Sequence, residues 1–436
     1  MAESGAETEA PNEPALSRWA RRLQGRSRPP SESVPTNGRA ARRRARRSTA
    51  KRRWHVARRV LAFVLVLAAI PVGISYYQFM TIPAQDSLSV RTVEWMRENG
   101  MAGVVNGVEH WWYANHAPPE GGRLEHGLPK AAAPTGSAAS QRINANALAG
   151  STVAPHLPPP ANMQPLVGLP QPDEGVWKPT GRSVAGLPAV YSTYFRPDAV
   201  HTSLVAAAMW MDTSLLKSVF VPGTRQPPGA PQTWGAQVPQ TEWPNLVAAF
   251  NSGFEMRDTR GGVYTDGRMV IPLADGGASF VIDKNGKANV GAWGRDFEMS
   301  PDIASVRQNL ALILDNGQPV AGLPDNADGA WGATLGNRVF VWRSGVGVDQ
   351  NGGLVYVAGP GLSAVTLAIL LQRAGAVRAM ELDINSDWVT GYTYQQTDPA
   401  NPGAITGDKL LPSMSHGNDR YLQPSESDFF ALLSGY

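Results

Sequence analysis

The stretch at residues 379–391, AMELDINSDWVTG, places acidic side chains at the end of an apolar run. In an extended strand Glu381 and Asp383 point to the same face, about 7 Å apart, because alternate side chains share a face. Asp383 stands at the carboxyl end of this predicted strand, where open α/β sheets tend to build ligand sites. A carboxylate there either binds a cation or a hydroxyl group or caps the following turn, and the local pattern leaves both roles open.

An amide side chain ends a second apolar run, in AAFNSGFEMRDTRGG at residues 248–262. Asn251 closes the run, and Gly253 and Phe254 begin a polar loop that contains glycine. A rigid strand followed by such a loop is a common way to present a side chain to a ligand. An Asx-turn at Asn251 is the structural alternative.

A third segment, VFVWRSGVGVDQNGG at residues 339–353, places Arg343 and Ser344 after four residues of β-rich apolar character. A guanidinium held by a strand can bind a phosphate through two parallel hydrogen bonds. An arginine on a strand also serves as a surface residue or as half of an ion pair. This segment alone does not decide between these roles.

A divalent cation is a further hypothesis for the acidic loop. Asp383, Asn385 and Asp387 imitate the first three ligand positions of an EF-hand, but Trp388 stands where that motif needs glycine, so the EF-hand is excluded. A different calcium site built from these oxygens, or from DNADG at 325–329, stays open as the cofactor hypothesis. The chain has no cysteine, which excludes thiolate-zinc and thiol redox chemistry.

Together the three segments resemble the phosphodiester glycosidase family. The matching stretches are NSGF at 251–254, beside the family's NGGF, RSGVGVD at 343–349, beside RTAIG and a following DG, and GLSAVTLAILLQRAGAVRAMELD at 361–383, beside a helix and strand ending in LNLDGGGSS. The order and approximate spacing of the family elements are kept, and the helix-strand segment is the most specific part.

The resemblance implies hydrolysis of a sugar from a phosphate at the anomeric carbon. Asp383 would stabilise an oxocarbenium-like centre, Arg343 would hold the phosphate, and Asn251 would fix a sugar hydroxyl or a phosphate oxygen. Substrate contacts are expected from the neighbouring residues of the same motifs, namely Gly253, Phe254, Ser344 and Asn385. The expected substrate is a phosphorylated sugar or cell-wall glycan.

Two departures from the family pattern support an alternative function. Ser252 replaces the second glycine of NGGF, and the residues INSDW at 384–388 stand where the family has Gly-Gly-Gly-Ser-Ser. Glycine lets a substrate approach the backbone closely, so bulky side chains here would reshape the site. The alternative is a catalytically inactive protein on the same fold that binds an envelope glycan or a partner.

A membrane segment is predicted near the N-terminus, because residues 60–80 carry no charged side chain. At about 1.5 Å per residue this helix covers the hydrocarbon core of about 30 Å. Residues 1–59 carry 16 Lys and Arg against 5 Asp and Glu, whereas the remaining residues carry 23 against 31. The positive-inside rule therefore predicts a single-pass membrane protein with a cytoplasmic N-terminus and an extracytoplasmic C-terminal part, and nucleic-acid binding is not expected.

The chain divides into five predicted regions. A disordered basic tail at 1–58 and a transmembrane helix at 59–80 precede juxtamembrane helices at 81–116, a Pro- and Ala-rich linker at 117–181, and a phosphodiester glycosidase-like domain at 182–436. The last region mixes predicted hairpins with one helix that begins at Ser363 and ends before Gly375. These signals predict a single α+β or mixed α/β domain with a mixed sheet and β-hairpins.

Overall fold

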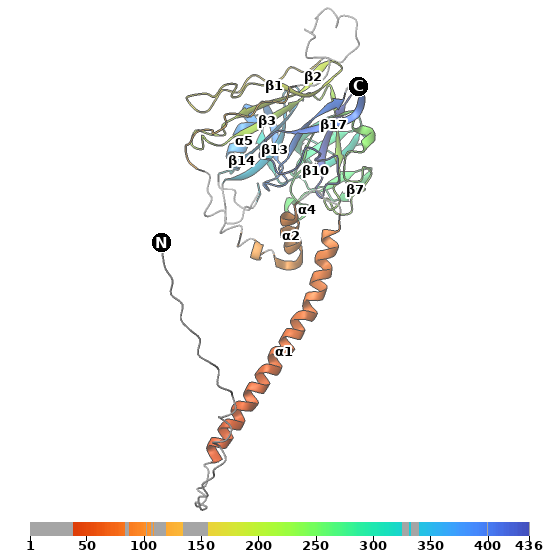
Figure 1. Ribbon diagram of the computed structural model, residues 1–436. Helices are drawn as coiled ribbons and strands as arrows, with labels where there is room; N and C mark the ends of the chain where they lie inside the picture. The colour runs from red at the N-terminus through yellow and green to blue at the C-terminus, as the bar shows by residue number, and fades with distance from the viewer. Residues whose placement is uncertain are drawn as a thin grey trace, which may run out of the picture. The chain divides into compact units, whose positions relative to one another are not determined.

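The computed structural model describes residues 38–82, 87–101, 103–105, 108, 119–133, 156–324, 331–332, 340–398 and 400–435. The chain divides into two compact units, residues 1–73 and residues 74–436, and each is described by itself. Figure 1 shows the course of the chain and labels its helices and strands.

The long N-terminal helix α1 runs over Gly38–Met80 and includes Pro71. Its portion Arg53–Met80 is long and apolar enough to cross a membrane, which agrees with the predicted transmembrane segment by length and composition. A signal sequence near an N-terminus meets the same criteria. Among the described residues, the structure therefore contains one candidate membrane helix.

Three antiparallel sheets make up most of the unit of residues 74–436. An eight-stranded sheet has the order β1-β2-β3-β14-β13-β15-β11-β12, and two five-stranded sheets have the orders β7-β6-β10-β8-β9 and β17-β16-β5-β18-β4. The first contains β1 Lys178–Val184, β2 Leu187–Phe195, β3 Ala206–Met211, β11 Leu312–Asp315, β12 Gln318–Pro319, β13 Val341–Asp349, β14 Leu354–Leu362 and β15 Ala376–Glu381. The second contains β6 Val263–Thr265, β7 Arg268–Ile271, β8 Ala278–Asp283, β9 Ala288–Ala292 and β10 Ile303–Gln308, and the third contains β4 Leu216–Val221, β5 Leu246–Asn251, β16 Gly391–Asp398, β17 Asn401–Lys409 and β18 Phe429–Ser434.

The predicted sheet-rich domain with hairpins is confirmed, but the strand directions differ from the expected mixed sheet. All pairs of named strands among the described residues are antiparallel, including β15, which lies between β13 and β11 inside the large sheet. The helix before β15 connects it to β14, and these two strands run in the same direction because each pairs antiparallel with β13, which lies between them.

The main helix of the domain, α5 Ala364–Arg373, begins where the sequence predicted. The Ser363 side chain accepts a hydrogen bond from the Thr366 amide at 2.9 Å, which satisfies one of the free amides of the first turn. Gly375 follows the helix with φ of 101°, a backbone conformation that glycine adopts without a steric penalty. The buried face of α5 packs on β13, β14 and β15, and so fixes the strand that leads to Asp383.

An aromatic cluster joins the three sheets at the centre of the core. The Phe250 ring on β5 lies 5.0 Å from Tyr356 on β14 and 5.6 Å from Phe430 on β18, measured between ring centroids. The Phe430 ring stacks on Phe280 of β8 at 4.0 Å. Because each of the three sheets contributes at least one ring to this cluster, the sheets are packed as one body, and the segment after Phe250 is held rigidly.

Shorter helical elements complete the described chain. α2 Leu88–Met96 is followed by the π-helical turn η1 Arg97–Met101, in which Gly100 has φ of 80°. Both elements lie within the range 81–116 that was predicted to hold juxtamembrane helices, of which only part is described. A 3-10 turn, η3 Gln240–Glu242, and one helical turn, α4 Met256–Thr259, flank β5.

Candidate functional site

The three predicted segments meet at one buried polar cluster. Asn251 at the end of β5 donates from Nδ2 to the Ser344 hydroxyl on β13 at 3.1 Å. The Ser344 amide donates to the Asp383 carbonyl at 2.9 Å, which places the end of β15 beside β13. The fold therefore brings the amide segment, the arginine segment and the acidic segment together, as their order along the sequence suggested.

The Asn251 side chain is fully engaged in structural hydrogen bonds. Its Oδ1 accepts from the Tyr356 hydroxyl at 2.9 Å and from the Thr390 amide at 3.3 Å, and the residue is 4% exposed. Together with the bond to Ser344, these bonds connect Asn251 to three elements. Ser344 lies on β13, Tyr356 lies on β14, and Thr390 immediately precedes β16. In this conformation the amide positions the neighbouring strands rather than facing an open space.

Asp383 has one bonded and one unbonded carboxyl oxygen, and the residue is 1% exposed. Its Oδ1 accepts from the Asn385 amide at 2.8 Å, whereas its Oδ2 accepts no hydrogen bond from any residue that the structure describes. Burial raises the pKa of Asp383 well above its ordinary value, and the charges of Glu255 and Glu381 add to this shift, while backbone amides oppose it. The environment favours a neutral carboxylic acid, whereas the sequence suggested a charged stabilising carboxylate.

Arg343 is 2% exposed, and its guanidinium forms an ion pair with Glu381 on the adjacent strand. It also donates from Nε to the Leu362 carbonyl at 2.9 Å and from Nη1 to the Trp331 carbonyl at 3.4 Å. Burial raises the pKa of Glu381, and the charge of Arg343 opposes that shift. The sequence left several roles open for this guanidinium, among them phosphate binding and ion pairing. In the structure it forms an ion pair with a carboxylate.

The predicted substrate-contact residues surround the same cluster. A Cβ added to Gly253 would lie 3.1 Å from Cγ of Asn309, so glycine allows that amide to approach. Phe254 is buried, and a Cβ added to Gly332 would meet its ring at 2.9 Å. Asn385 is half-buried, and its Oδ1 accepts from the Asp387 amide at 3.0 Å.

Residues at the end of β10 belong to this cluster, although they were missed in the sequence. Arg307 Nε lies 2.7 Å from Asp428 Oδ2, and its Nη2 donates to the Phe254 carbonyl at 2.5 Å. Asn309 donates from Nδ2 to the Glu381 carbonyl at 2.6 Å and to the Leu382 carbonyl at 2.8 Å. The signal in the sequence was the polar run RQN at 307–309, which lies between two apolar strands. Because alternate residues of a strand point to opposite faces, at least one of these polar side chains must point into the core.

The structure offers limited support for a metal site. Among the described residues there is no group of three or more His, Cys, Asp or Glu placed to hold a metal ion. In the loop after β15, Asp383 Oδ1 and Asn385 Oδ1 each accept a backbone amide two residues further on, which is the Asx-turn geometry. The second predicted calcium segment, 325–329, lies outside the described residues.

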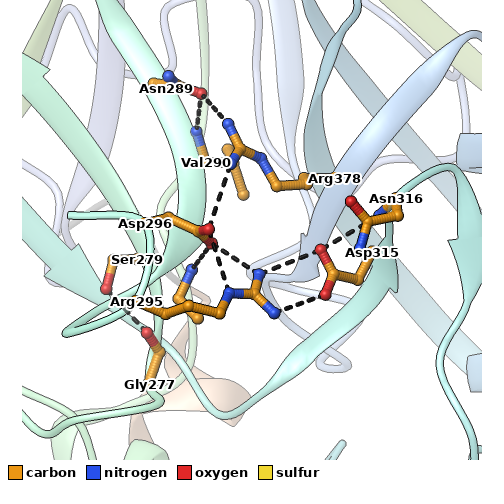
Figure 2. Close-up of polar contacts among 10 residues, drawn as sticks. Gly277, Ser279, Asn289, Val290, Arg295, Asp296, Asp315, Asn316 and Arg378 are labelled. Carbon is orange, nitrogen blue, oxygen red and sulfur yellow. Dashed lines mark hydrogen bonds and ion pairs between the residues drawn. The ribbon is translucent and has the colours of Figure 1, made fainter.

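A separate polar network lies where β9 and its following turn meet β11 and β15 (Figure 2). Arg295 pairs with Asp315 at 2.6 Å and with Asp296 at 2.7 Å, and Arg378 lies 3.5 Å from Asp296. Beside it is a cavity of about 480 Å³, lined by Asp275, Gly276, Ala292, Trp293, Gly294, Arg295, Leu312, Asp315 and Val320. None of these lining residues belongs to the predicted site.

Part of the chain that contains the polar cluster matches a known protein family. Residues 244–383 match the phosphodiester glycosidase family. The matched segment begins just before β5 and ends at Asp383, so it contains all three predicted motifs. The resemblance inferred from the sequence is confirmed.

Comparison with solved structures gives weaker likenesses. The catalytic domain of zebrafish N-acetylglucosamine-1-phosphodiester alpha-N-acetylglucosaminidase, auto-inhibited by its pro-peptide, is 16% identical, with 57% of this chain and 84% of that chain covered and a TM-score of 0.37. A hypothetical protein from Synechocystis is 12% identical, with 59% and 64% covered and a TM-score of 0.32. An exported protein from Burkholderia pseudomallei is 13% identical, with 53% and 74% covered and a TM-score of 0.26. No match was found among curated proteins.

Proposed function

We propose that this protein is a membrane-anchored phosphodiester glycosidase that cleaves a sugar-phosphate linkage of an envelope glycan. The observation that carries the proposal is the buried cluster in which Asn251, Ser344 and Asp383 meet within the segment that matches the phosphodiester glycosidase family. Helix α1 would be the anchor, with the basic N-terminal residues in the cytoplasm and the domain outside the cell.

The reaction is a hydrolysis at the anomeric carbon. The bond between C1 of the sugar and the phosphate oxygen breaks, water adds its hydroxyl to C1, and the phosphate oxygen gains a proton. The products are a reducing sugar and a phosphomonoester. The departing phosphate is a weak base, so modest acid assistance and stabilisation of positive charge at C1 would suffice.

Asp383 is the residue assigned to this chemistry. As a neutral acid it would donate the proton of its free Oδ2 to the departing oxygen, and the resulting carboxylate would stabilise charge at C1. Asn251 and Arg343 would act as positioning residues, because their side chains hold Ser344 and Glu381 next to Asp383. Gly253, Phe254, Ser344 and Asn385 are the proposed substrate contacts.

A specific observation favours a second candidate, a glycan- or partner-binding protein without turnover. Trp388 is buried and Ile384 is half-buried, at positions where the family carries glycine or serine. Glycine or serine at these positions would leave more room for a sugar to approach the backbone than isoleucine or tryptophan does. Saturable binding without turnover would be the mark of this function.

A turnover assay on the full chain in detergent micelles separates the two candidates. The probe is methyl N-acetylglucosamine 1-phosphate, and the products measured are reducing sugar and methyl phosphate. Asp383→Asn is compared with Asp258→Asn, a change at an exposed position on α4. The glycosidase is supported if the parent and Asp258→Asn release methyl phosphate and Asp383→Asn does not. If every variant binds the probe and none releases methyl phosphate, the glycosidase is refuted and the second candidate is favoured.

A further inference from the structure

Arg91 of α2 ties the end of helix α1 to the domain. The last turn of α1, residues 74–80, belongs to the same compact unit as the sheets. Arg91 donates from Nη2 to the Phe79 carbonyl at 2.7 Å and to the Ile82 carbonyl at 2.8 Å, which satisfies carbonyls that a helix end leaves free. Its Nε lies 3.0 Å from Glu426, and both side chains are buried.

A second arginine makes a parallel connection. The Arg225 guanidinium lies over the Phe79 ring, 3.8 Å from the ring centroid, and forms an ion pair with Glu98 of η1. The next residue, Gln226, accepts the Met256 amide on its Oε1 at 3.1 Å. Arg225 and Gln226 therefore link the end of α1 to α4, the helical turn in the loop after Asn251.

Both connections lead to the candidate site. Two residues after Glu426, the Asp428 carbonyl accepts from the Ser252 hydroxyl at 2.9 Å, and its carboxylate pairs with Arg307. On the other path, Met256 follows Glu255, which is buried and whose charge raises the pKa of Asp383. In Figure 1 α2 lies next to α4, which agrees with these contacts.

The same segment exposes apolar side chains to its surroundings. Tyr77 and Leu88 are 70% and 71% exposed, and Val104 and Val108 are also exposed. These apolar side chains lie at the end of α1 and in the short helical segments that follow it. Apolar and aromatic side chains next to a membrane helix are suited to the interface of a bilayer.

We propose that the substrate is a sugar phosphodiester whose aglycone is a membrane lipid. This inference rests on the proposed function. Because the loops of the site are bonded to Phe79 and Ile82 at the end of α1, the proposal is that they act close to the bilayer surface, where the phosphate of such a lipid lies. The lipid would stay in the membrane as a phosphomonoester, and the sugar would leave as the reducing sugar.

A competition assay tests the substrate class. The full chain is reconstituted in phospholipid vesicles that contain N-acetylglucosamine 1-phosphate esterified to a polyprenol, and the methyl ester is supplied in solution at equal bulk concentration. We expect polyprenyl phosphate to form at least about tenfold faster than methyl phosphate, because enzyme and lipid share one surface. Equal rates, or faster release from the methyl ester, would overturn the inference and leave the proposed function standing, whereas no release from either probe would refute the proposed function itself.

A variant tests the role of the docked anchor in this preference. Arg225→Ala removes the contacts with Phe79 and Glu98, and we expect it to reduce the lipid preference while turnover of the methyl ester is kept. The control is Arg268→Ala, an exposed arginine on β7, which should leave both rates unchanged. An undiminished lipid preference in Arg225→Ala would contradict the inferred coupling.

Fluorescence quenching tests the orientation without any substrate. The chain has no cysteine, so a single introduced cysteine can be labelled specifically. Asp258→Cys places a label on α4, and Gln350→Cys places one in the exposed turn at the opposite end of β13 from Arg343. A lipid with a nitroxide headgroup should quench the label at 258 more strongly; equal or reversed quenching would overturn the inferred orientation.

Discussion

Replacing Asp383 with asparagine separates its chemical role from its structural role. In the folded protein Oδ1 accepts one backbone amide and Oδ2 has no described hydrogen-bond partner. Asparagine keeps an acceptor for the Asn385 amide, and its NH2 group replaces the hydroxyl of a neutral acid. Since no charge and no hydrogen bond is lost, the free energy of unfolding should change by no more than about 1 kcal/mol.

Alanine at the same position should behave differently. Asp383→Ala leaves the Asn385 amide buried without its acceptor, which costs about 1–3 kcal/mol, and the lost carboxyl leaves a small cavity. Both variants remove the proton donor, so both should lower kcat by about 10²–10⁴ if Asp383 acts as a general acid. The two variants are thus expected to be equally inactive but unequal in stability.

The assays are denaturant unfolding of the full chain in micelles and release of methyl phosphate, each measured at neutral pH. Asp258→Asn serves as the matched control, because it makes the same chemical change on an exposed side chain. Activity of Asp383→Asn within about twofold of the parent would refute the assignment of Asp383 as proton donor. A loss of several kcal/mol in Asp383→Asn would instead show a charged carboxylate held by its surroundings.

Three further predictions concern stability. Burial raises the pKa of Asp383 above its unfolded value, so its contribution to stability is present below the unfolded pKa of about 4 and is lost as pH rises toward the folded pKa. The Tm of the parent should therefore fall relative to that of Asp383→Asn as the pH rises above about 4, and parallel Tm curves would contradict the raised pKa. Asp428→Ala leaves Arg307 buried without its carboxylate and should lower the unfolding free energy by about 3–5 kcal/mol in denaturant titration; a loss below about 1 kcal/mol would show that water replaces the carboxylate. Ser363→Ala removes the N-cap of α5 and should cost about 1 kcal/mol in the same titration, with Ser363→Asp as a variant that restores the cap; equal losses in both would rule out capping as the cause.

Signals that act over a few residues were predictable from the sequence. The cap at Ser363 and the stop at Gly375 define α5 through contacts within one helical turn, and the turn residues 284–286 define the β8–β9 hairpin. The strand leading to Asp383 was evident from its mostly apolar residues, AVRAME at 376–381. These elements depend on local backbone geometry, which the residue types specify directly.

Contacts between distant segments were not predictable in the same way. The Arg307 partner, Asp428, lies 121 residues further along the chain, and no local pattern couples them. The partner of Arg343 could not be predicted from the sequence. Whether its guanidinium meets Glu381 or faces outward depends on the strand register between β13 and β15. The strand directions also depended on where the β13–β14 hairpin inserts, which is a property of the whole sheet.

The position of β18 has a consequence for biogenesis. This strand pairs with both β4 and β5, and Phe429 lies directly opposite Asn251. The neighbouring bond from Ser252 to Asp428 joins residues 176 positions apart. The interior of the domain therefore stays open until almost all of the chain through residue 434 has been synthesised, so a domain exported during translation would reach the far side of the membrane before it could fold.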